Sequence, residues 1–174
     1  AAAPSTSEPR IISQQPPGTR DGARTMLDWV GMLGSQLPEE QFLAIKALRN
    51  LSVARHQQLA IMASGAMVPL IALMTHATTE VRAVAAATIG NLAAHSQNQR
   101  PIAAAGGILP LVQLLAPELS WDAKEHAAKA LRNLAADQDN ETVIKAAGAI
   151  APLISLLDHG TPARVQEQAA GALG

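Results

Sequence analysis

Gly106-Gly107-Ile108-Leu109-Pro110-Leu111 is one of three related segments that decide the fold of this 174-residue chain. Residues 65–70 read Gly-Ala-Met-Val-Pro-Leu, and residues 148–153 read Gly-Ala-Ile-Ala-Pro-Leu. The prolines of the three segments are 41 and then 42 residues apart. A glycine that ends one helix, followed by a proline in the first turn of the next, marks a sharp bend between two helices. The sequence therefore predicts the same bend three times.

A second landmark recurs with the same period. The chain reads Asn-Leu-Ser at 50–52, Asn-Leu-Ala at 91–93 and Asn-Leu-Ala at 133–135, again 41 and 42 residues apart. Two independent landmarks that share one period indicate a tandem repeat. The composition agrees with a helical repeat, because hydrophobic residues make up 48% of the chain and aromatic residues only 2%, and alanine and leucine favour helices.

Each repeat is predicted to contain three helices. A short helix (140–147) precedes the glycine, a second helix (108–115) contains the proline, and a longer third helix covers 79–94 and 121–136. Ser120 and Thr161 are the predicted N-caps of third helices. Apolar residues at helical spacing are expected to form the seam between layers, namely Leu43, Ala47, Leu48, Leu51, Val84, Thr88, Ile89, Leu92, Ala127, Ala130, Leu131 and Leu134.

The Gly-x-x-x-Pro-Leu bend and the Ala-Leu-x-Asn-Leu signature of the third helix resemble the armadillo repeat family. The second signature is complete at 47–51 and 130–134, while residues 88–92 depart from it. The resemblance covers about residues 22–174 and implies an all-α, right-handed α-solenoid. Residues 164–173 look most like the broad plant, algal and fungal type of this repeat. HEAT repeats, the nearest competitor, have two helices in each unit.

The repeat divides the chain into five parts. We expect a Pro/Ser-rich extended tail (1–21), a partial N-terminal capping repeat (22–54), two full armadillo repeats (55–96 and 97–138) and a truncated repeat (139–174). The last residues stop one position short of the next expected asparagine. We therefore expect a longer parent protein, or a partner that covers this end of the stack.

The sequence offers little catalytic or metal-binding chemistry. The chain has no cysteine, a net charge of −1 and no pair of histidines one helical turn apart, so we expect no zinc site, no cofactor and no nucleic-acid partner. The acidic run at 137–141 lacks the spacing of a calcium loop, and we interpret it as a solvated turn between repeats. We expect a protein that is not an enzyme and that has no membrane-spanning segment.

The resemblance places a binding groove on the concave face lined by the third helices. In this family the repeated asparagine clamps the backbone of a bound chain, which implies this role for Asn50, Asn91 and Asn133. An alternative stays open, in which these amides only tie their own helix to a neighbouring segment. Nuclear-import adaptors of the family carry tryptophan four residues before this asparagine. Here the position holds Lys46, Ala87 and Lys129, so recognition of classical basic localisation signals is not expected.

Cations accompany the asparagine in the first and third units. Lys46 with Arg49, and Lys129 with Arg132, lie within one helical turn of Asn50 and Asn133. The second unit has Ala87 and Gly90 at these positions and is neutral. The pattern predicts a preference for an acidic or phosphorylated segment, although a solvated charged face explains it equally well.

The sequence thus favours a scaffold or adaptor that binds an extended or helical segment of a protein partner. One alternative is a permanent structural subunit of a large assembly, and a lesser one is an enzyme accessory or chaperone-like solenoid. We expect a cytoplasmic protein, or a nuclear or organellar one if a targeting segment precedes Ala1.

Overall fold

The computed structural model describes residues 24–174, apart from the side chain of His76. The tail predicted at 1–21, and the first two residues of the predicted capping repeat, lie outside the described residues. The described part contains eleven α-helices and no strand: α1 (Met26–Leu33), α2 (Pro38–Ser52), α3 (Arg55–Ala63), α4 (Met67–His76), α5 (Thr79–Ala93), α6 (Ser96–Ala104), α7 (Ile108–Gln113), α8 (Trp121–Ala135), α9 (Gln138–Ala146), α10 (Ile150–Ser155) and α11 (Ala163–Leu173).

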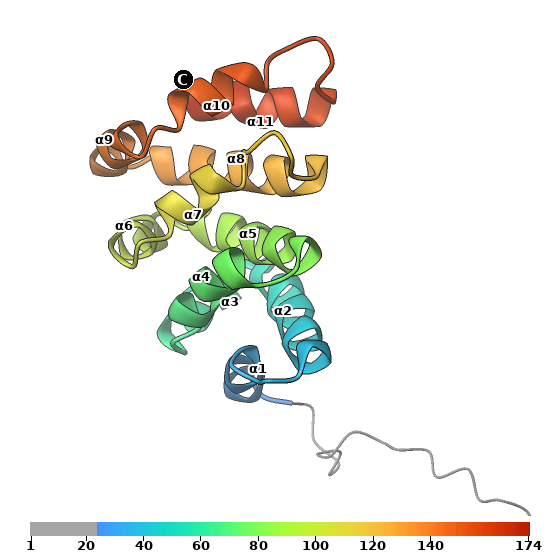
Figure 1. The fold of residues 1–174 in the computed structure, drawn as a ribbon. Helices are drawn as coiled ribbons and strands as arrows, with labels where there is room; N and C mark the ends of the chain where they lie inside the picture. Colours follow the sequence, from blue (N-terminus) through green and yellow to red (C-terminus); the bar gives the residue numbers. More distant parts are fainter. Residues whose placement is uncertain (1–23) are drawn as a thin grey trace, which may run out of the picture.

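The helices are stacked in layers along one axis (Figure 1). Three layers have a short first helix, a second helix and a long third helix: α3–α4–α5, α6–α7–α8 and α9–α10–α11. The helices α1 and α2 form the layer before them. Each third helix packs on the next one, α2 on α5, α5 on α8 and α8 on α11. The all-α solenoid that the resemblance implies is confirmed.

The bend between first and second helices depends on glycine. Gly65, Gly106 and Gly148 have φ angles of 81°, 83° and 81°, in the left-handed region that other residues avoid. Each follows directly on the C-cap residue of a first helix, where this conformation ends the helix and lets the chain turn. The predicted helix break is therefore confirmed at all three positions.

The third helices begin at side-chain caps in two of the layers. The hydroxyls of Thr78 and Ser120 accept hydrogen bonds from the backbone N–H groups of Val81 and Ala123. Threonine and serine are common N-cap residues for this reason. The prediction of Thr161 as a cap is wrong. Pro162 occupies the N-cap position of α11 with φ −56° and ψ 137°, and it has no side-chain oxygen to offer.

Two predicted boundaries also differ from the structure. The second helix α7 ends at Gln113 rather than at residue 115, because the chain tightens into turns before the next helix. The acidic run at 137–141 is not a turn. Asp137 caps α9 by accepting from the N–H groups of Asp139 and Asn140, and Arg100 of the preceding layer pairs with both Asp137 and Asp139. This ion pairing lowers the pKa of Asp137.

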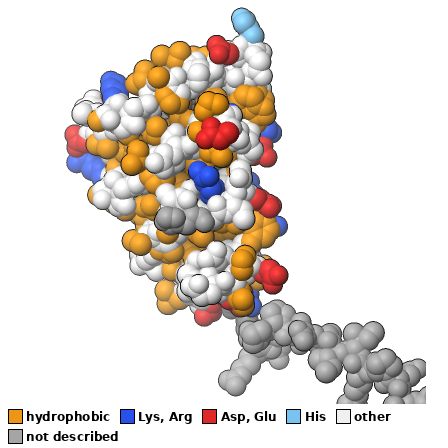
Figure 2. Space-filling view, in the orientation of Figure 1, with side chains coloured by type: hydrophobic (Ala, Val, Ile, Leu, Met, Phe, Trp, Pro, Cys, Tyr) orange, Lys and Arg blue, Asp and Glu red, His pale blue; other side chains and the backbone are white. Residues whose placement is uncertain are grey.

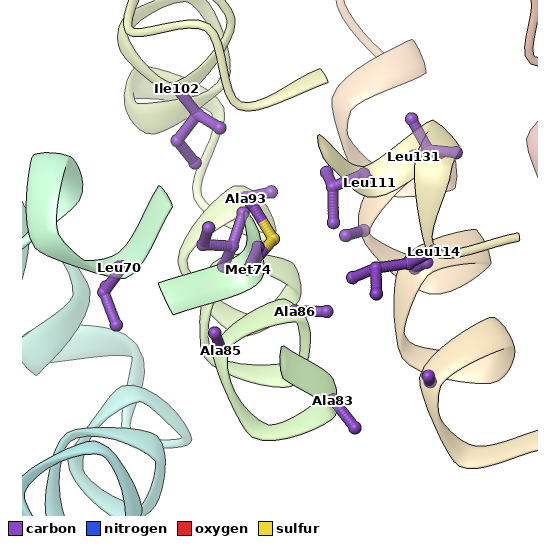
Figure 3. Close-up of a cluster of buried hydrophobic side chains, with 14 of the residues drawn as sticks. Leu70, Met74, Ala83, Ala85, Ala86, Ala93, Ile102, Leu111, Leu114 and Leu131 are labelled. Atoms are coloured by element: carbon purple, nitrogen blue, oxygen red, sulfur yellow. The ribbon is translucent and has the colours of Figure 1, made fainter. Parts of the chain in front are cut away.

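The core consists of small and aliphatic side chains between the layers. In Figure 3, Met74 of α4, Leu111 of α7 and Leu114, which directly follows α7, lie around the alanines of α5, and all three are buried. The packing between α5 and α8 is close, since a Cβ atom placed on Gly90 would stand 3.4 Å from the Cβ atom of Ala130. Most of the predicted seam is buried, but Leu43 is 47% exposed. Leu43 lies seven residues before Asn50, on the same exposed side of α2.

Buried amides join each third helix to the first helix of the next layer. In every case the side-chain N–H donates to the backbone carbonyl six residues earlier, at 2.9–3.2 Å. Carbonyls at a helix end have no partner within the helix, and these amides satisfy them without water. The pairs are Gln58 with Ser52, Asn98 with Leu92, Gln99 with Ala93, and Asn140 with Leu134.

A second set of donors lies near the start of each third helix. These side chains stand 41, 42 and 42 residues apart and donate to a carbonyl in the segment before the helix. Lys124 is the most enclosed of them, at 4% exposure, with its Nζ atom 4.4 Å above the Trp121 ring. The pairs are Gln41 with Ser35, Arg82 with Met74, Lys124 with Pro117, and Gln166 with Asp158.

No single helix among residues 24–174 has the length and apolar character needed to cross a membrane. The helices α3 and α4 pass that test only when taken together, and they are bent by 90° relative to each other.

We expect Asn98→Ala to lower the free energy of unfolding by about 1–3 kcal/mol, because it removes the two buried hydrogen bonds that the Asn98 amide donates to the Leu92 and Gln58 carbonyls. The measurement is urea unfolding followed by circular dichroism at 222 nm. The neighbouring Gln97→Ala is the control, since Gln97 is exposed. Equal stability of the two variants would contradict a structural role for this amide.

Candidate functional site: the face of the third helices

One side of each third helix repeats the same set of positions. Residues spaced by 4, 7 and 11 along an α-helix share a face, so the asparagine and the residues 4, 7 and 11 before it form one stripe in each layer. We call the three stripes together the third-helix face. It consists of Glu39, Leu43, Lys46 and Asn50 on α2, Glu80, Val84, Ala87 and Asn91 on α5, and Asp122, His126, Lys129 and Asn133 on α8.

The three predicted asparagines differ in their surroundings. Asn50 is exposed and makes no side-chain hydrogen bond within residues 24–174. The Nδ2 group of Asn91 donates to Ser52 Oγ at 3.0 Å, and Asn133 Nδ2 donates to the Gly90 carbonyl at 2.8 Å. Each bonded amide nitrogen keeps a second N–H and each carbonyl oxygen keeps lone pairs. The asparagines of the second and third layers thus tie their helices to the preceding layer and retain capacity for another partner.

A chain of hydrogen bonds connects three third helices. Lys129 Nζ on α8 donates to Asn91 Oδ1 on α5 at 3.3 Å. Asn91 donates to Ser52 Oγ on α2, and Ser52 donates to the Arg49 carbonyl at 2.7 Å. The repeat pattern does not predict this chain of hydrogen bonds. Its only signal is that Ser52 replaces the alanine found two residues after the other asparagines.

The four predicted cations are not equivalent. Lys46 is exposed, with its Nζ atom 4.9 Å from the centroid of the Phe42 ring. Arg49 is exposed and lines a hollow between the helices. Lys129 is half-buried and bonded to Asn91, as described above. Among the described residues, only the first layer therefore presents two cations whose side chains donate no hydrogen bond to another side chain.

Arg132 lies across the next layer instead of projecting freely. Its Nη1 atom is 3.4 Å from Gln168 Oε1 on α11. A Cβ atom placed on Gly171 would come within 2.7 Å of Arg132 Cδ and Nε, so glycine at this position leaves room for the arginine. Ala87 and Gly90 on α5, which the sequence marks as the neutral unit, are buried and let α8 approach closely.

A hollow of about 500 Å³ crosses the third-helix face. It extends from Arg49 on α2 past Glu80 and Val84 on α5 to Asp122 and His126 on α8. Burial lowers the pKa of His126 below its ordinary value of 6.5. Arg49 and Lys129 act in the same direction, whereas Glu125 and Asp122 favour the protonated form. A histidine in this position is neutral at pH 7 and can accept or donate one hydrogen bond at each ring nitrogen.

Negative charge on the third-helix face is concentrated at the N-terminal ends of its helices. The acids Glu39, Glu80 and Asp122 lie in the first turns of α2, α5 and α8, which is where an anion is favoured by the helix dipole. Figure 2 shows acidic side chains recurring along the edge where these helices begin. In the third layer Arg164 neutralises this edge, because it contacts Asp122 Oδ1 at 2.6 Å and Glu125 Oε2 at 2.8 Å.

Residues 24–174 contain no group of three or more His, Asp or Glu side chains placed to hold a metal ion. The third-helix face instead combines amides, isolated charges and apolar patches. This combination can hydrogen-bond a polypeptide backbone and sort its side chains by charge.

Comparisons with known proteins agree with this architecture. The family model described as Armadillo/beta-catenin-like repeat matches residues 55–94 and 137–174. No curated protein matches the chain.

Designed and engineered proteins are among the solved structures with a similar fold. A set of computationally designed armadillo repeat proteins for modular peptide recognition includes a chain at 30% identity and a TM-score of 0.81, with 86% of this chain and 63% of that chain covered. A designed armadillo repeat protein in complex with the peptide (KR)4 is 27% identical, with a TM-score of 0.80 and coverage of 86% and 63%. An engineered protein is 32% identical, with a TM-score of 0.80 and coverage of 85% and 36%. The chain therefore spans less than two thirds of the length of these structures.

We expect stability to fall as the pH drops through the ordinary pKa of histidine, about 6.5, because the unfolded chain takes up a proton at His126 that the folded chain resists. The contribution is fully present above this pH and is lost below it. Urea unfolding between about pH 7.5 and pH 5 tests the expectation. His126→Gln should flatten the dependence, and the control His56→Gln, at an exposed position, should keep the slope of the unmodified protein.

Proposed function

Because the chain belongs to the armadillo-repeat family, we propose that it is a non-enzymatic adaptor module which holds an extended segment of a partner protein along its third-helix face. The observation that carries the proposal is the row formed by Asn50, Asn91 and Asn133, which keeps unused hydrogen-bonding groups on the same three helices that line the hollow. A carboxamide offers a donor and an acceptor together, and this matches the N–H and C=O groups of an extended chain.

Peptide binding by similar folds supports the proposal. Designed armadillo repeat proteins of closely similar fold include one in complex with the peptide (KR)4 and others made for modular peptide recognition. Each backbone hydrogen bond contributes only about 0.5–1.5 kcal/mol. Several layers must therefore act together, and a stack of layers with one asparagine in each supplies that repetition.

The charge of the first layer suggests which segments would bind. Lys46 and Arg49 are exposed on one turn of α2, near Asn50, and no carboxylate pairs with them in the described structure. We infer that an acidic or phosphorylated side chain of the partner would lie over this turn. Lys129 and Arg132 contribute less, because Asn91 and Gln168 already accept hydrogen bonds from them.

We expect Asn50→Ala to weaken peptide binding without changing thermal stability, because Asn50 makes no internal side-chain hydrogen bond. Decapeptides selected from a random phage-displayed library on the immobilised chain would be labelled with fluorescein and measured by fluorescence anisotropy. The affinity should fall about threefold to tenfold, and further in the triple variant Asn50→Ala/Asn91→Ala/Asn133→Ala.

The matched control is Asn140→Ser. Asn140 is an asparagine of the layer junction and lies away from the third-helix face, so its loss should lower stability and leave the affinity of the folded protein unchanged. Unchanged affinity in the triple variant would reject the asparagine row as the binding element. An isolated chain that aggregates and is recovered only within a stoichiometric assembly would favour the permanent-subunit alternative.

The acidic preference has its own test. We expect the peptide (Ser-Glu)5 to bind more tightly than (Ser-Gln)5, and phosphoserine in place of serine to strengthen binding further. The variant Lys46→Gln/Arg49→Gln should remove this difference, with Arg55→Gln/Lys145→Gln as a control of equal charge change at exposed positions on other helices. Binding that ignores peptide charge, or a control variant that behaves like the first, would contradict the preference.

A further inference from the structure

A second hollow, of about 390 Å³, lies between the N-terminal ends of α2 and α5. Its wall is mainly apolar and includes Pro38, Phe42 and Val81, and two carboxylates, Glu39 and Glu80, line it as well. Glu80 also lines the larger hollow that continues toward α8. Glu39 and Glu80 belong to the third-helix face, so the smaller hollow adjoins one end of that face.

The two carboxylates carry charge that the described structure does not balance. Both Glu39 and Glu80 are exposed, and neither forms an ion pair within residues 24–174. The corresponding acid of the third layer, Asp122, is paired with Arg164. Arg49 shares the larger hollow with Glu80 but forms no ion pair with it. The first two layers thus present an apolar hollow with an unpaired anion on each of its two helices.

We propose that this hollow receives an arginine side chain of the bound segment, so that the partner carries a basic side chain at the Glu39–Glu80 end of the face in addition to an acidic one over Lys46 and Arg49. The proposal rests on the proposed function and specifies the chemistry of its ligand. Charge complementarity selects this occupant. An arginine has an apolar stem that suits the walls of Phe42 and Val81, and its planar guanidinium offers several donors in fixed directions, enough for two carboxylates.

The order of groups along α2 fixes where the two charges of the partner would lie. Glu39, Phe42 and Lys46 follow one another at intervals of three and four residues, each about one helical turn. The helix therefore presents an anion, an aromatic ring and a cation in sequence across the width of the face. Side chains of an extended peptide point alternately to opposite sides. A peptide that lies across the layers with arginines on one side and glutamates on the other would place its arginines near Glu39 and Glu80 and its glutamates near Lys46 and Arg49.

Three labelled decapeptides test the inference by fluorescence anisotropy on the full chain: (Arg-Glu)5, (Ser-Glu)5 and the block peptide Arg-Arg-Arg-Arg-Arg-Glu-Glu-Glu-Glu-Glu. We expect (Arg-Glu)5 to bind about tenfold more tightly than (Ser-Glu)5. It should also bind more tightly than the block peptide, whose composition is the same but whose charges are not separated onto two sides. The resonances of the Val81 methyl groups should shift with (Arg-Glu)5 and stay in place with (Ser-Glu)5.

The variant Glu39→Gln/Glu80→Gln should remove most of the gain for (Arg-Glu)5 and leave (Ser-Glu)5 within about twofold. The variant Glu118→Gln/Glu167→Gln removes the same charge outside the hollow, from exposed positions, and should bind both peptides like the unmodified chain. If (Ser-Glu)5 binds in a manner that depends on Asn50 and the arginines add nothing, the inference is wrong and the proposed function stands. If no peptide binds in a manner that depends on Asn50, both are wrong.

Discussion

Close contact between successive third helices is the constraint on which the rest of the structure depends. Gly90 and Ala130 bring α5 and α8 together with nothing larger than a methyl group between them, and α5 buries ten of its fifteen residues. Helices that approach this closely must have small side chains along the contact. The same contact sets the distance between neighbouring asparagines, since each of them is carried by the helix that packs. A larger residue in the seam would therefore disturb both the core and the third-helix face.

Polar groups inside the stack complete what apolar packing begins. Short helices leave many terminal carbonyls without partners, and a solenoid of short helices has such ends in every layer. Buried amides at the first helices and long donors at the third helices satisfy these carbonyls at regular intervals. Between layers, Asn133 donates to the Gly90 carbonyl and Asn91 donates to the Ser52 hydroxyl. The two readings of the repeated asparagine, internal tie and backbone clamp, are thus compatible, because one carboxamide has four hydrogen-bonding positions.

The distribution of charge gives the face a direction. Acids favour helix N-termini and bases favour C-termini for reasons of local stability, and parallel stacking of α2, α5 and α8 aligns these preferences into two edges. Arg164 neutralises the acidic edge in the third layer, and Arg132 is held against Gln168 and Gly171. The unpaired charges are consequently concentrated on α2 and the start of α5. The proposed recognition of both an acidic and a basic side chain follows from this uneven pairing.

The sequence by itself determined the period, the three helices of each layer, the glycine bends and most of the buried seam, because these depend on local conformation and on helical spacing. It also marked the asparagines and their neighbouring cations. Only the tertiary structure decided which of these side chains are already occupied. Lys129 and Ser52 are 77 residues apart in the sequence, and nothing local indicates that Asn91 joins them. The exposure of Leu43, the pairing of Arg164 with Asp122 and the apolar hollow beside Phe42 likewise require the distance and angle between whole helices, which a one-dimensional pattern does not contain.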